Sequence, residues 1–425
     1  MAGRTRLTIL GGGAGGAELA ARLGGRPDLA VTLVDRQPSH LWKPRLHEFA
    51  AGTIDSTLSD LSYYMLARMR GFDFEQGDVV AIDRAEKRVG LTGPAAPDGG
   101  GAAPRRLSYD RLVVALGGVT PDFGTTGVAE HAIRLDERAD ADRFRARFVA
   151  LMISARETGR AARVVIVGSG ATGTELAAHL RQVESGFFGA KHRGGRDILQ
   201  ILLAEAAPQL MPGADDTLRS NVEERLAALR IDTLTGAKVA AVEADGIVNA
   251  DGTRHPADIV VWAAGLVGNP RLCELADFDV DGKGRIRVDD RLRSSVDPAV
   301  QVFGDAASLT PEGAGAPLPP TAQCASQQAE YLATAIPALI RGDEPEPFVY
   351  GDRGRLLSLA RAGSVGQIGF GRRHDILVKG EFANAAYKSL QRRHQWTLLG
   401  PLRGGVAIFA DLISPAKGAQ LKLHG

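Results

Sequence analysis

Two glycine-rich loops with the same spacing constrain the fold of this chain more than any other feature. Both read G-x-G-x-x-G, with Gly11, Gly13 and Gly16 in the first loop and Gly168, Gly170 and Gly173 in the second. Each loop follows an apolar, strand-like run and precedes a helix-like run. The first glycine allows a tight turn, the second lets a pyrophosphate approach the backbone, and the third lets the helix pack on the strand. Because the helix N-terminus offers free N–H groups to phosphates, the two loops predict two dinucleotides bound at once.

Size and composition indicate a soluble protein of two or three domains. The chain has 425 residues, with 44% hydrophobic and 24% charged residues, which is typical of globular proteins but too long for one core. A net charge of +1 gives no indication of a nucleic-acid partner. Cys273 and Cys324 are the only cysteines, so we predict neither a redox disulfide nor a metal site. No apolar run approaches the ~20 residues of a membrane-spanning helix, so we expect a cytosolic protein with at most peripheral membrane contact.

An acidic residue follows each loop at the end of the next predicted strand. Asp35 comes 19 residues after the first loop, where an acid accepts a hydrogen bond from an adenosine ribose. Glu205 comes 32 residues after the second loop, and a Gly- and Lys/Arg-rich insertion at 185–196 accounts for the longer spacing. No arginine follows Glu205 to meet a 2′-phosphate, so its carboxylate favours NADH over NADPH.

The order of the predicted strands indicates that the first domain is split. Strands expected at 72–92 and 106–115 continue the first unit, and a strand at 258–265 closes the second. A strand at 300–307, ending in Gly304-Asp305, then resumes the first pattern. We therefore predict an α/β fold with two Rossmann-like dinucleotide-binding domains, the second inserted in the first. The predicted boundaries are 1–125 with 285–370, 126–284, and a C-terminal helical region at 371–425.

The C-terminal region differs in charge and pattern from the rest. Residues 371–425 hold nine Lys/Arg against three Asp/Glu. Apolar residues recur there at helical spacing, at Leu402, Val406, Phe409 and Ile413, as on one face of an amphipathic helix. Such a helix could bind anionic lipid, or cap the protein or a dimer interface. The side chains to test are Arg392, Arg393, Trp396 and Arg403.

The order of motifs resembles the two-dinucleotide-binding-domain flavoproteins, and within them the type II (non-proton-pumping) NADH:quinone oxidoreductases. The most specific stretch is 318–329, in which P-P-T-A-Q is followed by A-S-Q-Q. The resemblance is weakest at 371–425, where that family varies most. The other matching stretches are 11–18, 40–52, 109–117, 165–175, 261–265 and 303–306.

This resemblance implies FAD in the first domain and NADH in the second. Asp305 would bind the FAD ribityl chain, and Lys43 would lie along the flavin, although a long basic side chain could equally lie on the surface. The expected FAD residues are Gly11, Gly13, Ala14, Gly15, Gly16, Asp35, Arg36, Lys43, Val80, Ala115, Gly117, Asp305, Thr321, Ala322 and Gln323. The expected NADH residues are Gly168, Gly170, Ala171, Thr172, Gly173, Glu175, Glu205, Ala264 and Gly265.

The resemblance also implies the catalytic residues and the electron acceptor. Glu175 would lie at the nicotinamide–flavin contact, where it accepts the carboxamide N–H₂ or assists proton movement. The alternative is N-terminal helix stabilisation, since Glu18 occupies the same place after the first loop. Gln323 and Gln327, four residues apart, share a helix face and would meet quinone carbonyls, or form an ordinary polar face. The protein would lie on the cytoplasmic face of the cell membrane, against its inner leaflet, as a monomer or homodimer.

Other functions remain open from the sequence alone. Sulfide:quinone and disulfide reductases need cysteines that this chain lacks. Ferredoxin or rubredoxin reductases use FAD and NADH without cysteines, although the 318–329 stretch and the basic tail argue against them. A sensor that binds FAD and NAD(H) without rapid turnover is a further alternative.

Overall fold

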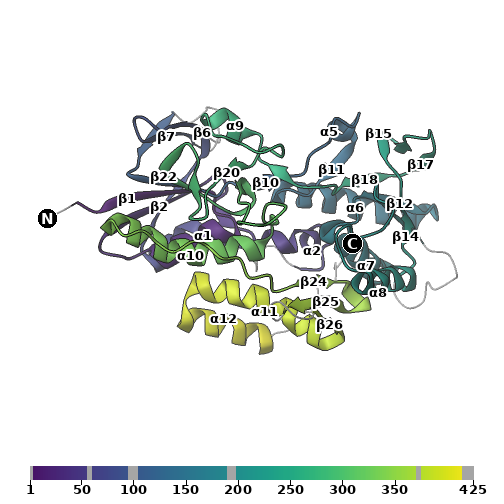
Figure 1. Cartoon of the computed structure of the whole chain (residues 1–425). Coiled ribbons are helices and arrows are strands. Elements are labelled where there is room, and N and C mark those ends of the chain that lie inside the picture. Colours follow the sequence, from purple (N-terminus) through teal and green to yellow (C-terminus); the bar gives the residue numbers. More distant parts are fainter. Residues whose placement is uncertain (1–2, 55–59, 94–103, 189–197, 370–374, 414–425) are drawn as a thin grey trace.

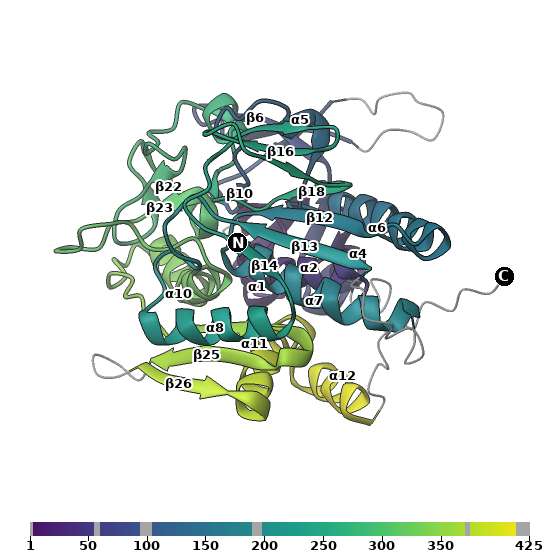
Figure 2. The same cartoon turned by 90° about the vertical axis from the view of Figure 1, so that its right-hand side faces the viewer.

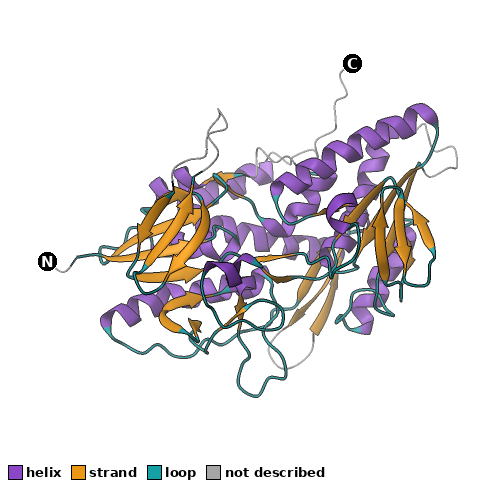
Figure 3. Ribbon diagram, turned by 90° about the horizontal axis from the view of Figure 1, so that it is seen from above, coloured by secondary structure: helices purple, strands orange, loops and turns teal. Residues whose placement is uncertain are grey.

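Two α/β halves lie side by side in the computed structural model, and the C-terminal elements run beneath both (Figure 1). The strands form groups towards two ends of the molecule with long helices between them (Figure 3). The structure describes residues 3–54, 60–93, 104–188, 198–369 and 375–413.

The first half is built on a six-stranded sheet in the order β21-β22-β9-β1-β2-β5. β1 pairs in parallel with β2 and β9, and β9 pairs in parallel with β22. Because β22 follows the whole second half in sequence, the first domain is split as predicted. The strands are β1 (Thr5–Leu10), β2 (Leu29–Asp35), β5 (Asp73–Gln76), β9 (Arg111–Val114), β21 (Arg293–Ser294) and β22 (Asp297–Val302).

Helices α1 (Ala14–Leu23) and α10 (Ala322–Arg341) pack against each other and share one apolar core with this sheet. Buried residues such as Leu7 and Ile9 on β1 form that core, as expected for a parallel sheet covered on both faces. The strand predicted at 300–307 ends at Val302, because the chain turns at Gly304, which has φ +69°.

The second half contains a five-stranded parallel sheet in the order β11-β18-β12-β13-β14. Long helices α6 (Arg138–Thr158), α7 (Ala171–Phe188) and α8 (Asp216–Ala228) pack around it (Figure 2). The helix predicted near 140–160 is thereby confirmed. The strands are β11 (Ala132–Arg134), β12 (Ala162–Val167), β13 (Leu199–Ala204), β14 (Asp232–Leu234) and β18 (Ile259–Trp262).

Each half also carries a small three-stranded antiparallel sheet, and a short ribbon joins the halves. β10 (Gly118–Val119) pairs with β19 (Val267–Gly268) at that junction. The long strand expected at 72–92 is instead three strands, because the chain turns back between β6 and β7. The small sheets consist of β6 (Asp78–Asp83), β7 (Arg88–Thr92) and β8 (Arg105–Ser108), and of β15 (Val239–Glu243), β16 (Gly246–Asn249) and β17 (Arg254–Pro256).

The sequence predicted a helical region at 371–425, but a strand precedes the helices there. β26 (Asp375–Lys379) pairs antiparallel with β25 (Ser364–Gly369), which pairs with β24 (Arg355–Ser358). Helix α11 (Gly380–Leu399) then packs on α1 and on α4 (Tyr63–Arg70), and leads into α12 (Pro401–Ile413). Among the described residues, no helix is both long and apolar enough to cross a bilayer.

Candidate active site

A cavity of about 530 Å³ lies between the two halves, at the carboxyl ends of the strands of the first sheet. Ligands of open α/β sheets bind at this edge, and the volume suits a ligand of dinucleotide type. The first glycine loop and the ends of β2 and β9 line the cavity. Thr172, Ala263 and Gly265 of the second half are also among the lining residues.

The first glycine loop has the geometry of a phosphate cradle. Gly11 adopts φ +100°, which favours glycine. A Cβ on Gly16 would lie 1.9 Å from the Gly11 carbonyl oxygen, so the helix packs there without a side chain. Nothing lies within 4 Å of the place where a Cβ on Gly13 would stand. The open position at Gly13 faces the cavity and leaves room for a pyrophosphate at the N-terminus of α1.

The second loop repeats this geometry. Gly168 has φ +105°, and a Cβ on Gly173 would lie 2.0 Å from the Gly168 carbonyl oxygen. The position at Gly170 is open, with nothing within 4 Å of its would-be Cβ. Both loops therefore have a turn glycine, an open glycine and a glycine at the close contact of helix and strand.

The two strand-end acids close their loops through backbone N–H groups. The Gly12 N–H donates to Asp35 Oδ2 at 2.7 Å, and the Gln37 N–H donates to Oδ1 at 2.8 Å. Glu205 Oε2 accepts from the Ser169 N–H at 2.9 Å and from the Ser169 hydroxyl at 2.7 Å. Burial raises the pKa of Asp35. Each acid therefore fixes the loop in addition to any contact with a ribose.

Asp305 and Lys43 also line the cavity. Burial raises the pKa of Asp305, and the nearby cations Lys43 and Arg285 oppose that rise. Lys43 Nζ donates to the Gly118 carbonyl at 3.2 Å and lies 3.9 Å from an Asp136 carboxylate oxygen. Lys43 is therefore oriented into the site by its neighbours.

Three of the expected FAD residues do not line the cavity. Val80 is 43% exposed, and Val79 lines the cavity instead, because successive side chains of a strand point to opposite faces. The hydroxyl of Thr321 accepts from the Cys324 N–H at 3.2 Å and caps α10. Gln323 does not line the cavity either. The remaining twelve line it: Gly11, Gly13, Ala14, Gly15, Gly16, Asp35, Arg36, Lys43, Ala115, Gly117, Asp305 and Ala322.

Of the expected NADH residues, Thr172 and Gly265 reach this cavity. The other seven, which stand around or behind the second loop, do not line it: Gly168, Gly170, Ala171, Gly173, Glu175, Glu205 and Ala264.

Several cavity residues were missed by sequence reasoning. Asp136 accepts from the Thr120 N–H and hydroxyl, and Arg271 pairs with Asp78 across 193 residues of sequence. No local pattern marks such pairs.

Glu175 lies behind the cavity wall, one helical turn beyond Thr172 on α7. Its Oε1 accepts from the Ser358 N–H at 2.7 Å, and its Oε2 lies 3.5 Å from His47 Nδ1. Burial raises the pKa of Glu175 well above its usual range. The backbone of β24 therefore occupies one oxygen of a buried carboxyl, and the contact of Glu175 with the carboxamide stays a prediction.

Titratable side chains from three helices surround Glu175. In α2 (Leu46–Ala51), burial lowers the pKa of His47 to about 3. In α7, burial lowers the pKa of His179, whose Nδ1 lies 3.1 Å from the Thr53 hydroxyl. Burial raises the pKa of Tyr387 on α11, and Glu175 raises it further. The Nε2 atoms of both histidines are buried and have no hydrogen-bond partner among the described residues.

Gln323 and Gln327 are hydrogen-bonded to the segment 350–353, and their contact with a quinone stays a prediction. Gln327 Nε2 donates to the Gly351 carbonyl at 2.8 Å, and its Oε1 accepts from the Gly351 N–H at 3.0 Å. Gln323 Nε2 donates to the Tyr350 hydroxyl at 2.9 Å, and its Oε1 accepts from the Arg353 N–H at 3.2 Å. Both side chains therefore hold the segment 350–353 against α10.

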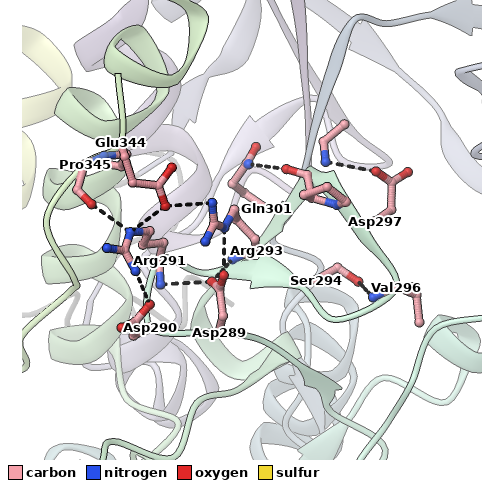
Figure 4. A network of polar contacts seen from close by, with 12 residues as sticks. Asp289, Asp290, Arg291, Arg293, Ser294, Val296, Asp297, Gln301, Glu344 and Pro345 are labelled. Atoms are coloured by element: carbon pink, nitrogen blue, oxygen red, sulfur yellow. Dashed lines mark hydrogen bonds and ion pairs between the residues drawn. The ribbon is translucent and has the colours of Figure 1, made fainter. Parts of the chain in front are cut away.

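The chain between α10 and that segment is fixed at 344–345 by an ion-pair network (Figure 4). Arg291 donates to the Pro345 carbonyl at 2.8 Å and pairs with Glu344 at 3.0 Å. Arg293 pairs with the same Glu344 and with Asp289. The segment after α10 is thus held at both ends.

Comparison with known proteins gives the family. The model of the pyridine nucleotide-disulphide oxidoreductases matches residues 5–329. A type II NADH:quinone oxidoreductase of Haemophilus influenzae is 33% identical, over 98% of this chain and 99% of that protein. The chain belongs to the type II NADH:quinone oxidoreductases. The enzyme Ndh of Mycobacterium tuberculosis, of the same description, is 31% identical over 86% of this chain and 80% of its own length.

The fold agrees with this assignment. The structure of NDH2 from Plasmodium falciparum in complex with NADH matches with a TM-score of 0.81, at 18% identity, over 98% of this chain and 99% of that one.

The broader family takes its description from disulphide chemistry, and both cysteines of this chain are free. Its two cysteines lie far apart in sequence, Cys273 exposed and Cys324 buried. Burial and the nearby Asp305 raise the pKa of Cys324 to about 12, so its reactive thiolate form is suppressed.

Proposed function

We propose that this chain binds FAD in the cavity, oxidises NADH and passes the electrons to a membrane quinone. The observation that carries the proposal is that both glycine loops serve one cavity, the first through Gly11 to Gly16 and the second through Thr172. Dinucleotides held on the two loops would meet end to end there. The relatives of this chain, which are NADH:quinone oxidoreductases, indicate a quinone as the acceptor.

The residues on the cavity wall fit FAD. Gly13 leaves room for the pyrophosphate, and Asp35 stands where an adenosine ribose would lie. Asp305 and Lys43 would meet the ribityl chain and the flavin. Bound FAD would supply the two-electron chemistry between NADH and quinone, while the protein supplies orientation and electrostatics.

Glu175 is the group that holds a proton for quinone reduction. Its raised pKa favours the protonated carboxyl, and α7 carries it one turn behind the cavity wall. His47 and His179 stay neutral beside it, because burial lowers both of their pKa values. A buried acid of this kind is suited to proton transfer near neutral pH.

The C-terminal helix α12 would place the enzyme on the cytoplasmic face of the membrane. Leu402, Val406 and Phe409 are 86%, 69% and 62% exposed. The excess of Lys and Arg in 371–425 would attract anionic lipid. No proton pumping is included in this proposal, since electrons would pass to quinone on one side of the membrane.

Half-reactions test the enzyme proposal. The purified protein should be yellow, NADH should bleach it, and a soluble quinone should restore the colour within seconds. Reoxidation by a ferredoxin but not by quinone would make it a ferredoxin-type reductase. Absence of bleaching would leave a sensor. An unchanged quinone KM in Gln327→Leu would exclude Gln327 from the quinone site.

Vesicle binding tests the membrane proposal. Leu402→Asp with Phe409→Asp should weaken binding to phosphatidylglycerol vesicles at least tenfold, because burying each side chain is worth about 1.5–3 kcal/mol. Met65→Asp, at an exposed position on α4, is the control and should bind normally. Normal vesicle binding of the double variant with loss of a dimer in ultracentrifugation would make this face a homodimer interface.

A further inference from the structure

A buried chain of hydrogen bonds joins helix α11 to the first glycine loop. His394 Nδ1 lies 2.7 Å from Glu18 Oε1, and His394 Nε2 lies 2.8 Å from His40 Nε2. His40 Nδ1 lies 2.8 Å from the Gly12 carbonyl oxygen, and the Ser326 hydroxyl donates to Glu18 Oε2 at 2.8 Å. Glu18, His40 and His394 are at most 3% exposed. The chain therefore crosses the interior from α10 and α11 to the loop.

The partners determine where the protons lie. The Gly12 carbonyl can only accept, so His40 Nδ1 carries a hydrogen and donates to it. Burial lowers the pKa of His40 to about 3, so this ring is neutral and its Nε2 accepts. His394 Nε2 must then donate to His40. A further proton lies between His394 Nδ1 and Glu18. It is either on the imidazole, which then donates to the carboxylate, or on the carboxyl, which then donates to the imidazole.

The backbone N–H and the backbone carbonyl of Gly12 are both hydrogen-bonded. Its N–H donates to Asp35 at 2.7 Å, and its carbonyl accepts from His40 and, at 2.5 Å, from the Tyr63 hydroxyl. A Cβ on Gly12 would lie 2.3 Å from that hydroxyl oxygen. The neighbouring residues Gly11 and Gly13 line the cavity. A change in the seating of His394 is therefore transmitted to the backbone that faces the dinucleotide.

Helix α11 also meets the first half through ring and apolar contacts. The Trp42 ring packs at a tilt of 35° against the His394 ring, with 4.0 Å between centroids, and Leu398 joins the apolar core of the first half. Because Glu18 is buried, removal of His394 would leave its carboxylate without this partner, which is strongly destabilising at such a site. His394 is thus the point at which α11 and the loop are energetically joined.

We propose that His394 is a positioning residue that couples the seating of α11 to dinucleotide binding at the first glycine loop. The proposal rests on the proposed function only in taking FAD as that dinucleotide. Coupling is reciprocal, so a bound cofactor stabilises α11 by the same factor by which seated α11 stabilises the cofactor. Since α11 leads into α12, loading of the cofactor also organises the proposed membrane helix.

The test compares holoproteins by the rate of FAD release and by amide hydrogen exchange. His394→Ala should release FAD about tenfold faster and should exchange faster both in α11 and in residues 10–18. His394→Gln keeps one donor and one acceptor and should lie between. Ser389→Ala, an exposed position on the same helix, is the control and should match the wild type.

A double-mutant cycle with His40→Asn separates coupling from simple loosening. If the two histidines act as one chain, the double variant should release FAD no faster than His394→Ala alone. Faster exchange confined to α11, with unchanged FAD release in both His394 variants, would overturn the proposal. If His394→Ala does not fold, the pair His394→Gln and His40→Asn gives the same comparison. A wild type that binds no FAD would instead refute the proposed function.

Discussion

In the first βαβ unit Glu18 lies two residues past the third glycine, and in the second Glu175 occupies the same place. Glu18 has a hydrogen bond to each oxygen, from Ser326 and with His394 at 2.7 Å. Glu175 has one backbone donor, and its histidine neighbour lies at 3.5 Å. The same position in two copies of one motif thus gives a fully partnered acid in one half and a less firmly held acid in the other.

The difference follows from what packs on each helix. α1 meets α10 and α11, which supply a hydroxyl and an imidazole. α7 meets α2 and β24, which supply a histidine and a backbone N–H. A bound FAD would remain in place during turnover, whereas NADH must exchange. The tighter polar packing accordingly lies on the side of the permanent ligand.

The largest expected effect tests the glycine-loop geometry that the two halves share. Gly16→Ala and Gly173→Ala should each lower the free energy of unfolding by about 3 kcal/mol, because the new Cβ would lie about 2 Å from a backbone oxygen. Gly13→Ala and Gly170→Ala should leave stability unchanged but weaken dinucleotide binding, since their sites are open. Urea titration measures stability. Equal stability losses at all four positions would contradict the assignment of two glycines to packing and two to dinucleotide binding.

Glu175→Gln tests the difference between the two acids. Reoxidation of the NADH-reduced protein by quinone should slow about 100-fold, with bleaching by NADH nearly unchanged. In the wild type, the protonated carboxyl is present below its raised pKa, so reoxidation should fall as pH rises through that value. The variant should lose this pH dependence, and Glu223→Gln, exposed on α8, should behave as wild type. A retained pH dependence would assign the proton to another group.

The smallest expected effect concerns the histidines beside the two acids. His40 and His47 have folded pKa values of about 3, below the usual 6.5. The unfolded state therefore binds more protons between these values, and stability falls as pH drops below 6.5. Each histidine should cost about 1 kcal/mol between pH 6.5 and 5.5. In urea titrations at the two pH values, His47→Asn should reduce the loss of unfolding free energy by the contribution of one histidine. An unchanged loss would mean that His47 is charged in the folded protein.

Local sequence patterns predicted those features that depend on neighbouring residues. The turns at Gly11 and Gly168, and the acids Asp35 and Glu205, follow from the order strand, loop, helix, strand. The sequence patterns did not predict features that depend on packing between distant segments. No residue near Gln327 in the sequence indicates that its side-chain amide binds the backbone N–H and carbonyl of Gly351. The exchange of Val80 for Val79 shows the same limit, because one residue of register decides which face a side chain takes.

The distance along the chain between Glu18 and His394, 376 residues, has a consequence for synthesis. At about 10 residues per second, a ribosome adds His394 some 40 s after Glu18. β22, the strand that completes its sheet, is added only about 28 s after Glu18, so for most of that time the nascent first domain lacks this strand as well. The second domain, whose strands all come from one continuous stretch, can fold during elongation. The domain whose first strands are made earliest is therefore the one whose folding finishes last.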